Sequence, residues 1–240
     1  FHDLGSIPYK FRLDPEFAQL AVDKCKERGL HARTVSYYGF PIDIGSILAL
    51  KLLNPDNRLP AIIVSSNMYA NRAETIVLGK SVRDAIDASG KKAVVVVVSA
   101  LSNRLHTVEI KPEDDKIHSL KDHEWNLKFL EYLDKGRLED VSQLSRQFHE
   151  EARVPKVVSF KPFWIMASMM GQTNLYEGNI LAYEPVWGTG SAVVTMTPAE
   201  DTAGDLEYDE DDPEFYKGDR EVLDFYEQPE MGPLEEEDGD

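Results

Sequence analysis

The feature that most constrains the fold of this chain is a run of five valines, Val94–Val98, that leads directly into the polar turn 99–105. β-branched side chains favour an extended backbone, and an uninterrupted apolar run of this length is typical of a strand buried on both faces. Such strands occur in parallel sheets that helices cover, and ligands bind beyond the carboxyl ends of their strands. The turn at Ser99, Ser102 and Asn103 is therefore where a functional site is expected.

Helical and extended segments alternate on both sides of this run. We expect helices at 15–28, 47–53 (with Ser46 as its N-cap), 74–89, 112–153 and 162–170, and strands at 32–36, 59–66, 178–187 and 191–197. Alternation of this kind implies right-handed crossovers between parallel strands. The sequence thus predicts an α/β fold, a single domain with a central, mostly parallel or mixed sheet flanked by helices.

Local signals mark several ends of these segments. Asp14 and Pro15 have the residue types of an N-cap and a first helical position. Gly90 is placed to end the third helix, and Gly136 to divide the long helical stretch in two. The sequence 188–190, Gly-Thr-Gly, predicts a tight turn between the last two strands.

The excess charge of the chain lies at its C-terminal end. The net charge is −17, and the segment 199–240 holds nineteen acidic residues against two basic ones, so that 1–198 is neutral. A segment this acidic and this poor in apolar residues resists collapse. We therefore expect a domain at 1–198 followed by an extended acidic tail at 199–240. Neither part has the basic face that nucleic-acid binding requires.

Five aromatic residues interrupt the charge of the tail: Tyr208, Phe215, Tyr216, Phe225 and Tyr226. Two interpretations stay open. The tail is a solvated extension, or it wraps onto the basic surface of a protein partner with these aromatic rings as anchors.

The longest apolar run, 93–98, is far shorter than the ~20 residues that span a bilayer, so no membrane-spanning segment is expected. Cys25 is the only cysteine, which excludes an internal disulfide and favours a cytoplasmic location. The sequence begins at Phe1 rather than methionine, and we expect an upstream segment to be missing.

Few residues have the spacing of a catalytic or metal site. His118 and His123 are five apart and do not share a helical face, and one cysteine with scattered histidines does not make a zinc site. No serine lies in a Gly-x-Ser-x-Gly elbow. His106 lies near the turn, in a functional or a structural role, and Asp43 could contact a ligand or stabilise its own loop. The candidate pocket residues are therefore Asp43, Ser99, Ser102 and His106.

Four segments, 38–46, 59–69, 94–105 and 181–194, resemble in order and spacing the class III extradiol ring-cleavage dioxygenases. The resemblance covers about residues 1–197, and it is strongest to the α-type subunits of the aminophenol-cleaving members. It implies that active members carry an iron-ligating histidine at the position of Ile44 and a proton-transferring histidine at that of Asn103. It also implies a glutamate ligand just before Trp164 and a further histidine ligand upstream of this sequence.

This chain departs from that pattern at each position that can be inspected. Ile44 cannot ligate a metal, and Asn103 cannot shuttle a proton near neutral pH. The stretch 159–163 holds no carboxylate, and its Lys161 would bring positive charge toward a metal. The resemblance therefore implies a catalytically inactive subunit without the Fe(II) of active members.

Such a subunit would assemble with a protein partner, either a homologous catalytic subunit or a larger complex. Two alternatives stay open. One is an active Fe(II)-dependent dioxygenase that cleaves aminophenol- or catechol-type aromatics, with iron held by other residues. The other is a scaffold protein that docks partners through its acidic tail.

Overall fold

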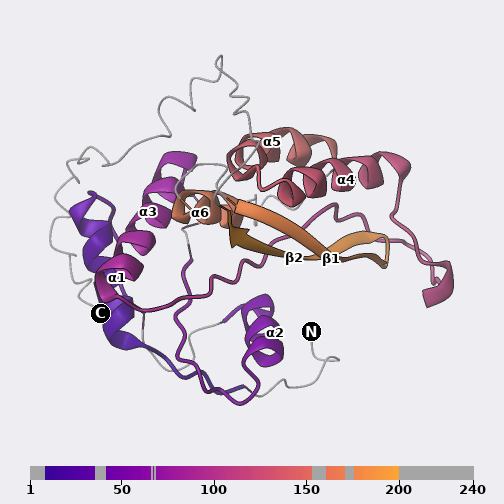
Figure 1. Cartoon of the computed structure of the whole chain (residues 1–240). Coiled ribbons are helices and arrows are strands. Elements are labelled where there is room, and N and C mark those ends of the chain that lie inside the picture. Colours follow the sequence, from indigo (N-terminus) through magenta and orange to yellow (C-terminus); the bar gives the residue numbers. More distant parts are fainter. Residues whose placement is uncertain are drawn as a thin grey trace, which may run out of the picture.

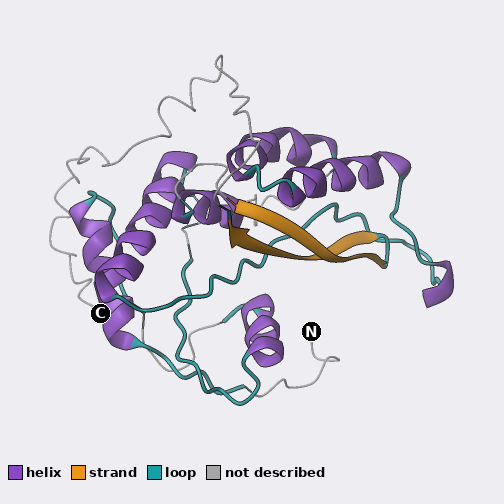
Figure 2. Cartoon of the chain, in the orientation of Figure 1, coloured by secondary structure: helices purple, strands orange, loops and turns teal. Residues whose placement is uncertain are grey.

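The computed structural model describes residues 9–35, 42–65, 67, 69–152, 161–170 and 176–199 (Figure 1). Over these residues the α-helices are α1 (Pro15–Glu27), α2 (Ile44–Leu53), α3 (Arg72–Ser89), α4 (Leu120–Asp134), α5 (Leu138–Glu151) and α6 (Lys161–Met169). A short 3-10 helix, η2, covers Pro112–Asp114, and the strands are β1 (Tyr176–Val186) and β2 (Thr189–Pro198). The described part of the chain is thus mixed, with six α-helices and one two-stranded sheet (Figure 2).

The sheet is an antiparallel hairpin closed by a two-residue loop. Val186 pairs with Thr189, and the two residues between them, Trp187 and Gly188, have φ angles of 54° and 89°. Positive φ at both loop positions gives a twist that matches the right-handed twist of the strands. The prediction of a tight turn between the last two strands is confirmed, but its position at 188–190 is not, because Thr189 and Gly190 already belong to β2.

Helix ends follow the local signals in the sequence. The Asp14 carboxylate accepts a hydrogen bond from the Phe17 amide at 3.0 Å, and Pro15 is the first residue of α1. Gly90 ends α3 in the left-handed conformation, with a φ of 63°. Gly136, with a φ of 68°, separates α4 from α5 as predicted, although residues 115–119 before α4 are not helical.

The N-cap of α2 differs from the prediction. Asp43, rather than Ser46, caps this helix, and α2 begins at Ile44. The Asp43 carboxylate accepts the Ser46 backbone N–H at 2.8 Å and the Ser46 hydroxyl at 2.6 Å. A charged acceptor for two donors is stronger than a serine hydroxyl, which explains the earlier start.

A central parallel sheet is not found among the described residues. The runs 32–35, 59–65 and 94–98 belong to no strand, and apart from the hairpin the described pairing is one parallel bridge between Leu13 and Ala61. Val94 is 88% exposed instead of buried. The predicted mostly parallel sheet is therefore wrong for this part of the chain. Valine side chains favour an extended backbone, but a strand forms only where a neighbour supplies its hydrogen bonds.

The largest hydrophobic core lies between α4, α5, α6 and the hairpin (Figure 1). Phe129 and Phe148 are fully buried there, with ring centroids 5.0 Å apart, and Phe163 meets Phe129 edge-on at 4.9 Å. Helix α3 packs against both α6 and α1, and Cys25 of α1 is buried in that contact region, as its place on an apolar stripe predicts. The hairpin is thus fixed against a helical layer.

No helix in the described ranges is long and apolar enough to cross a membrane. Residues 200–240 lie outside the described part of the chain. The division into a domain at 1–198 and a tail at 199–240 therefore stays a prediction.

The close contact at Gly136 leads to a stability prediction. A Cβ atom at Gly136 would lie 1.5 Å from the carbonyl oxygen of Tyr176, whereas a Cβ at Gly90 would meet nothing within 4 Å. Both glycines have a left-handed backbone conformation. The Gly90→Ala substitution should therefore lower the free energy of unfolding by about 1–2 kcal/mol through backbone strain alone. Gly136→Ala should cost about 3 kcal/mol or more, because α4 and β1 must also separate. Urea unfolding of both variants measures the difference, and equal losses would show that the contact is absent.

Candidate functional site

The polar turn after the valine run is held by one buried amide, that of Asn126 on α4. The Ser102 backbone N–H donates to Asn126 Oδ1 at 2.9 Å, and Asn126 Nδ2 donates to Ser102 Oγ at 2.7 Å. Ser102 is 1% exposed and Asn126 is fully buried. Because the Ser102 N–H needs an acceptor, Oδ1 must face it, which leaves both hydrogens of Nδ2 as donors.

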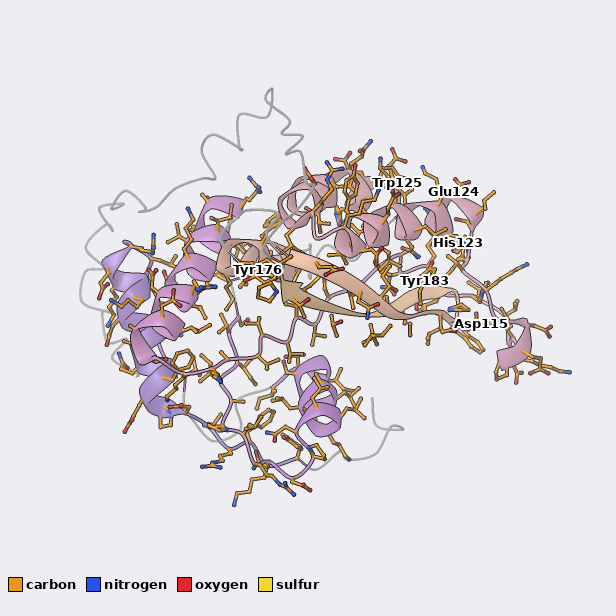
Figure 3. All side chains as sticks on the ribbon, viewed as in Figure 1. Asp115, His123, Glu124, Trp125, Tyr176 and Tyr183 are labelled. Carbon is orange, nitrogen blue, oxygen red and sulfur yellow. The ribbon has the colours of Figure 1, made fainter. Side chains whose placement is uncertain are left out.

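Tyr183 of β1 receives the second of these hydrogens. Asn126 Nδ2 lies 3.1 Å from the Tyr183 hydroxyl, and His123 Nδ1 lies 3.1 Å from the same oxygen. The oxygen already accepts from Asn126, so its own proton can be donated to His123 Nδ1 in the tautomer that leaves this nitrogen without a hydrogen. Burial raises the pKa of Tyr183, partly offset by the hydrogen bond from Asn126. Figure 3 shows His123 on α4 and Tyr183 on β1 close to one another.

Strand β2 packs against Ser102, Asn126 and Tyr183 at Gly190. The Gly190 N–H donates to the Ser102 carbonyl at 3.2 Å. A Cβ at this position would lie 2.4 Å from Asn126 Nδ2 and 3.3 Å from Tyr183 Cε2. Only glycine allows β2 to approach so closely. The turn, α4, β1 and β2 therefore meet at Ser102.

Two residues that follow the turn, His106 and Asp115, form hydrogen bonds to the loop of the hairpin. The Asp115 carboxylate accepts the backbone N–H groups of Trp187 and Gly188 at 2.5 and 3.0 Å. His106 Nε2 lies 3.6 Å from Asp115, its ring stacks on His118 with centroids 5.4 Å apart, and its backbone carbonyl accepts the Trp187 indole N–H. These contacts let His106 support the hairpin loop, and a functional role for His106 stays a prediction.

An ion pair fixes the residue next to Asn103. Arg104 Nε lies 3.3 Å from Asp122 Oδ2, and Asp122 is fully buried at the start of α4. Asn103 itself is exposed. The described structure thus places the backbone of the turn firmly while the amide of Asn103 faces solvent.

The other predicted pocket residues serve separate contacts. Asp43 caps α2, as described above, and Ile44 is 55% exposed at the start of that helix. A Cβ on Gly45 would lie 2.6 Å from Val98 Cγ1, so the start of α2 packs against the end of the valine run. Ser99, next in the chain, is half-buried. Among the residues described, α2 and the turn are neighbours, but Asp43, Ser102 and His106 each satisfy different partners.

The residues at the expected iron positions do not fit an iron site. Within the described ranges no group of three or more His, Cys, Asp or Glu side chains could hold a metal ion. Ile44 offers only hydrocarbon, and the buried Lys161 donates from Nζ to the Asn67 carbonyl at 2.9 Å. Burial lowers the pKa of Lys161, and the nearby Glu74 opposes this shift. Residues 159 and 160 lie outside the described structure, so the absence of iron stays a prediction.

Comparison with known proteins identifies the family. Residues 1–195 match the family described as the catalytic LigB subunit of aromatic ring-opening dioxygenase. The chain belongs to this family. This confirms the resemblance to class III extradiol dioxygenases that the four sequence segments indicate.

Two curated relatives are subunits of one kind of enzyme. The chain is 28% identical over 199 residues to the 2-aminophenol 1,6-dioxygenase alpha subunit of Pseudomonas sp, a match covering 82% of this chain and 72% of the relative. It is 33% identical over 205 residues to the beta subunit, a match covering 81% of this chain and 66% of the relative. The chain is therefore a LigB-family dioxygenase subunit, and these identities do not separate the alpha type from the beta type.

The sequence marks the turn but not the residues that bond to it. Ser102 is predicted by its position after the valines, whereas Asn126 and Tyr183 carry no motif. The hydrogen bonds from Asn126 reach 24 residues back and 57 residues forward along the chain. His123 is unremarkable by spacing to other histidines, because its partner is a tyrosine 60 residues away.

The buried amide gives the second prediction. Asn126→Ala should lower the unfolding free energy by about 2–4 kcal/mol, since the Ser102 N–H and the Tyr183 hydroxyl lose a buried partner. Hydrogen exchange at the Ser102 and Gly190 amides should accelerate in the same variant. Leu127→Ala, on the exposed side of the same helix, is the matched control and should change stability by less than about 1 kcal/mol. Unchanged protection at Ser102 in Asn126→Ala would contradict the role of the amide.

Proposed function

We propose that this chain is a non-catalytic dioxygenase subunit that supports assembly with a homologous, iron-bearing catalytic subunit. The observation that carries the proposal is the set of residues at the expected iron and proton-transfer positions. Ile44 is an exposed hydrocarbon, Asn103 is an exposed amide, and Lys161 is a buried cation. A two-histidine–one-carboxylate iron site needs three strong ligands on one face, and none of these side chains provides one.

An exposed apolar face supports a role in assembly. Helix α2 has no buried residue, and its Leu52 and Leu53 are 78% and 66% exposed. The start of α2 lies against Val98, and Val94–Val98 are also largely exposed. Exposed apolar side chains on neighbouring segments favour a protein–protein interface. The relatives are named as alpha and beta subunits, so a homologous subunit is the partner that we propose for this face.

Iron content and activity test the first part of the proposal. The chain, purified alone and supplied with Fe(II), should retain well below one iron per chain and should not open the ring of 2-aminophenol or catechol. Metal analysis and absorbance of the ring-opened product measure both, with a catalytic family member treated identically as the positive control. About one tightly bound iron per chain, together with ring cleavage by the chain alone, would establish the alternative of an active dioxygenase.

A second candidate role belongs to the acidic tail. The charge of the chain is concentrated in 199–240, and aromatic residues occur there at intervals: Tyr208, Phe215, Tyr216, Phe225 and Tyr226. This pattern favours docking onto a basic surface. The acidic side chains would attract such a surface over a distance, and the aromatic rings would supply the buried contact area. In this role the chain is a scaffold that joins its homologous subunit to a further protein.

Co-purification from the native cells tests the α2 face and the acidic tail independently. Leu52→Asp should abolish recovery of a homologous family member, because a carboxylate would be buried in the interface. Leu127→Asp, at an exposed leucine on α4, is the matched control and should retain that partner. Deletion of 199–240 should retain the homologue and lose any basic partner. If every partner is retained without the tail, its docking role is wrong, and if Leu52→Asp retains the homologue, the α2 face is wrong.

A further inference from the structure

We propose that His123, Asn126, Ser102 and Gly190 form a phenol-binding slot, and that the Tyr183 side chain of this chain is its occupant. The slot is defined by contacts to one ring and one hydroxyl, which are the two parts of a phenol. The geometry around Tyr183 defines the slot whether or not the chain binds iron or is catalytic.

The inner end of the slot recognises a hydroxyl group. Asn126 Nδ2 donates to the Tyr183 oxygen and His123 Nδ1 faces the same oxygen, both at 3.1 Å. With His123 in the tautomer that leaves Nδ1 as an acceptor, one donor and one acceptor together match a hydroxyl, which accepts one hydrogen bond and donates another. Asn126 is fully buried and its orientation is set by the Ser102 N–H, so its second hydrogen is unsatisfied unless a hydroxyl is present.

The walls of the slot recognise a flat ring. The His123 ring lies nearly parallel to the Tyr183 ring, with an interplanar angle of 12° and centroids 5.7 Å apart. Gly190 lies against the ring edge, where a Cβ would come within 3.3 Å of Tyr183 Cε2. An imidazole parallel to the ring and a glycine at the ring edge suit a planar aromatic group better than a branched aliphatic side chain.

The location of the slot is the turn at which family members are expected to act on a ring. Ser102, whose hydroxyl and amide are both bound to Asn126, directly precedes Asn103. Tyr183 reaches this turn from β1, close to the hairpin loop whose backbone N–H groups donate to Asp115. The chain therefore presents its own aromatic hydroxyl to the polar groups beside Asn103.

Chemical rescue of a truncated variant tests the slot. In the full chain, Tyr183→Ala removes the occupant, and phenol is the probe added back. Near-saturating phenol should raise the Tm of Tyr183→Ala by about 2–4 °C, because a ligand that binds only the folded state stabilises it. Toluene, which has the ring without the hydroxyl, should give less than half of that shift. The wild type, whose slot is filled, should shift by less than about 1 °C.

Tyr132→Ala is the matched cavity control. Tyr132 is a half-buried tyrosine of α4 whose ring lies under Arg137, outside the slot. Phenol should give this variant no shift beyond that of the wild type. Equal rescue of both alanine variants, equal rescue by toluene, or no rescue of a folded Tyr183→Ala would each overturn the proposal.

Tyr183→Phe keeps the test decisive if Tyr183→Ala does not fold. Phenylalanine retains the ring and removes only the hydroxyl, so NMR signals of the Asn126 side-chain amide and the His123 ring should both move. Added phenol should cause no further change, because the ring still fills the slot. Unmoved signals in Tyr183→Phe, or a phenol response at His123 in that variant, would show that Tyr183 is not the occupant.

Discussion

The side-chain amide of Asn126 is the interaction on which this part of the structure depends. It joins Ser102, on the polar turn, to Tyr183, on β1, and its close approach to Gly190 sets the position of β2. A buried amide is costly unless all of its groups are bonded, so the partners must keep their places together. The turn, the hairpin and α4 therefore form one unit rather than three independently placed segments.

Local chemistry explains which parts of the fold could be predicted. An N-cap such as Asp14 or a left-handed glycine such as Gly90 acts within one helical turn, and the sequence around it contains everything that is needed. The prediction of Ser46 instead of Asp43 as the N-cap of α2 is wrong by three residues, which is also within one helical turn. Strand pairing is different, because Val94–Val98 determine only an extended backbone, and whether a neighbour pairs with them is decided elsewhere in the chain.

The candidate site shows the same division between local and distant information. Ser102 could be located because it follows a long apolar run, and Ile44 and Asn103 because they interrupt recognisable family segments. Nothing local marks Tyr183, whose hydroxyl meets α4 across 57 residues of sequence. The resemblance thus marks the positions where this chain differs from iron-binding members, while the structure alone shows that Tyr183 bonds to the residues behind the turn.

The residues at the expected iron and proton-transfer positions and the hydrogen bonds around Asn126 bear on function in different ways. The residues at positions 44, 103 and 161 concern metal and proton chemistry, and each could in principle be restored by substitution. The hydrogen bonds from Ser102 through Asn126 to Tyr183 and His123 join these four side chains to one another, whereas the buried hydroxyl oxygen of Ser99, on the same turn, has no hydrogen-bond partner among the described residues. Placing a histidine at Asn103 would add a proton carrier beside a site whose donors are already occupied. If the chain is the non-catalytic subunit that we propose, with Tyr183 in the slot beside the turn, ring chemistry on this scaffold would require displacement of Tyr183 as well as a ligand set for iron.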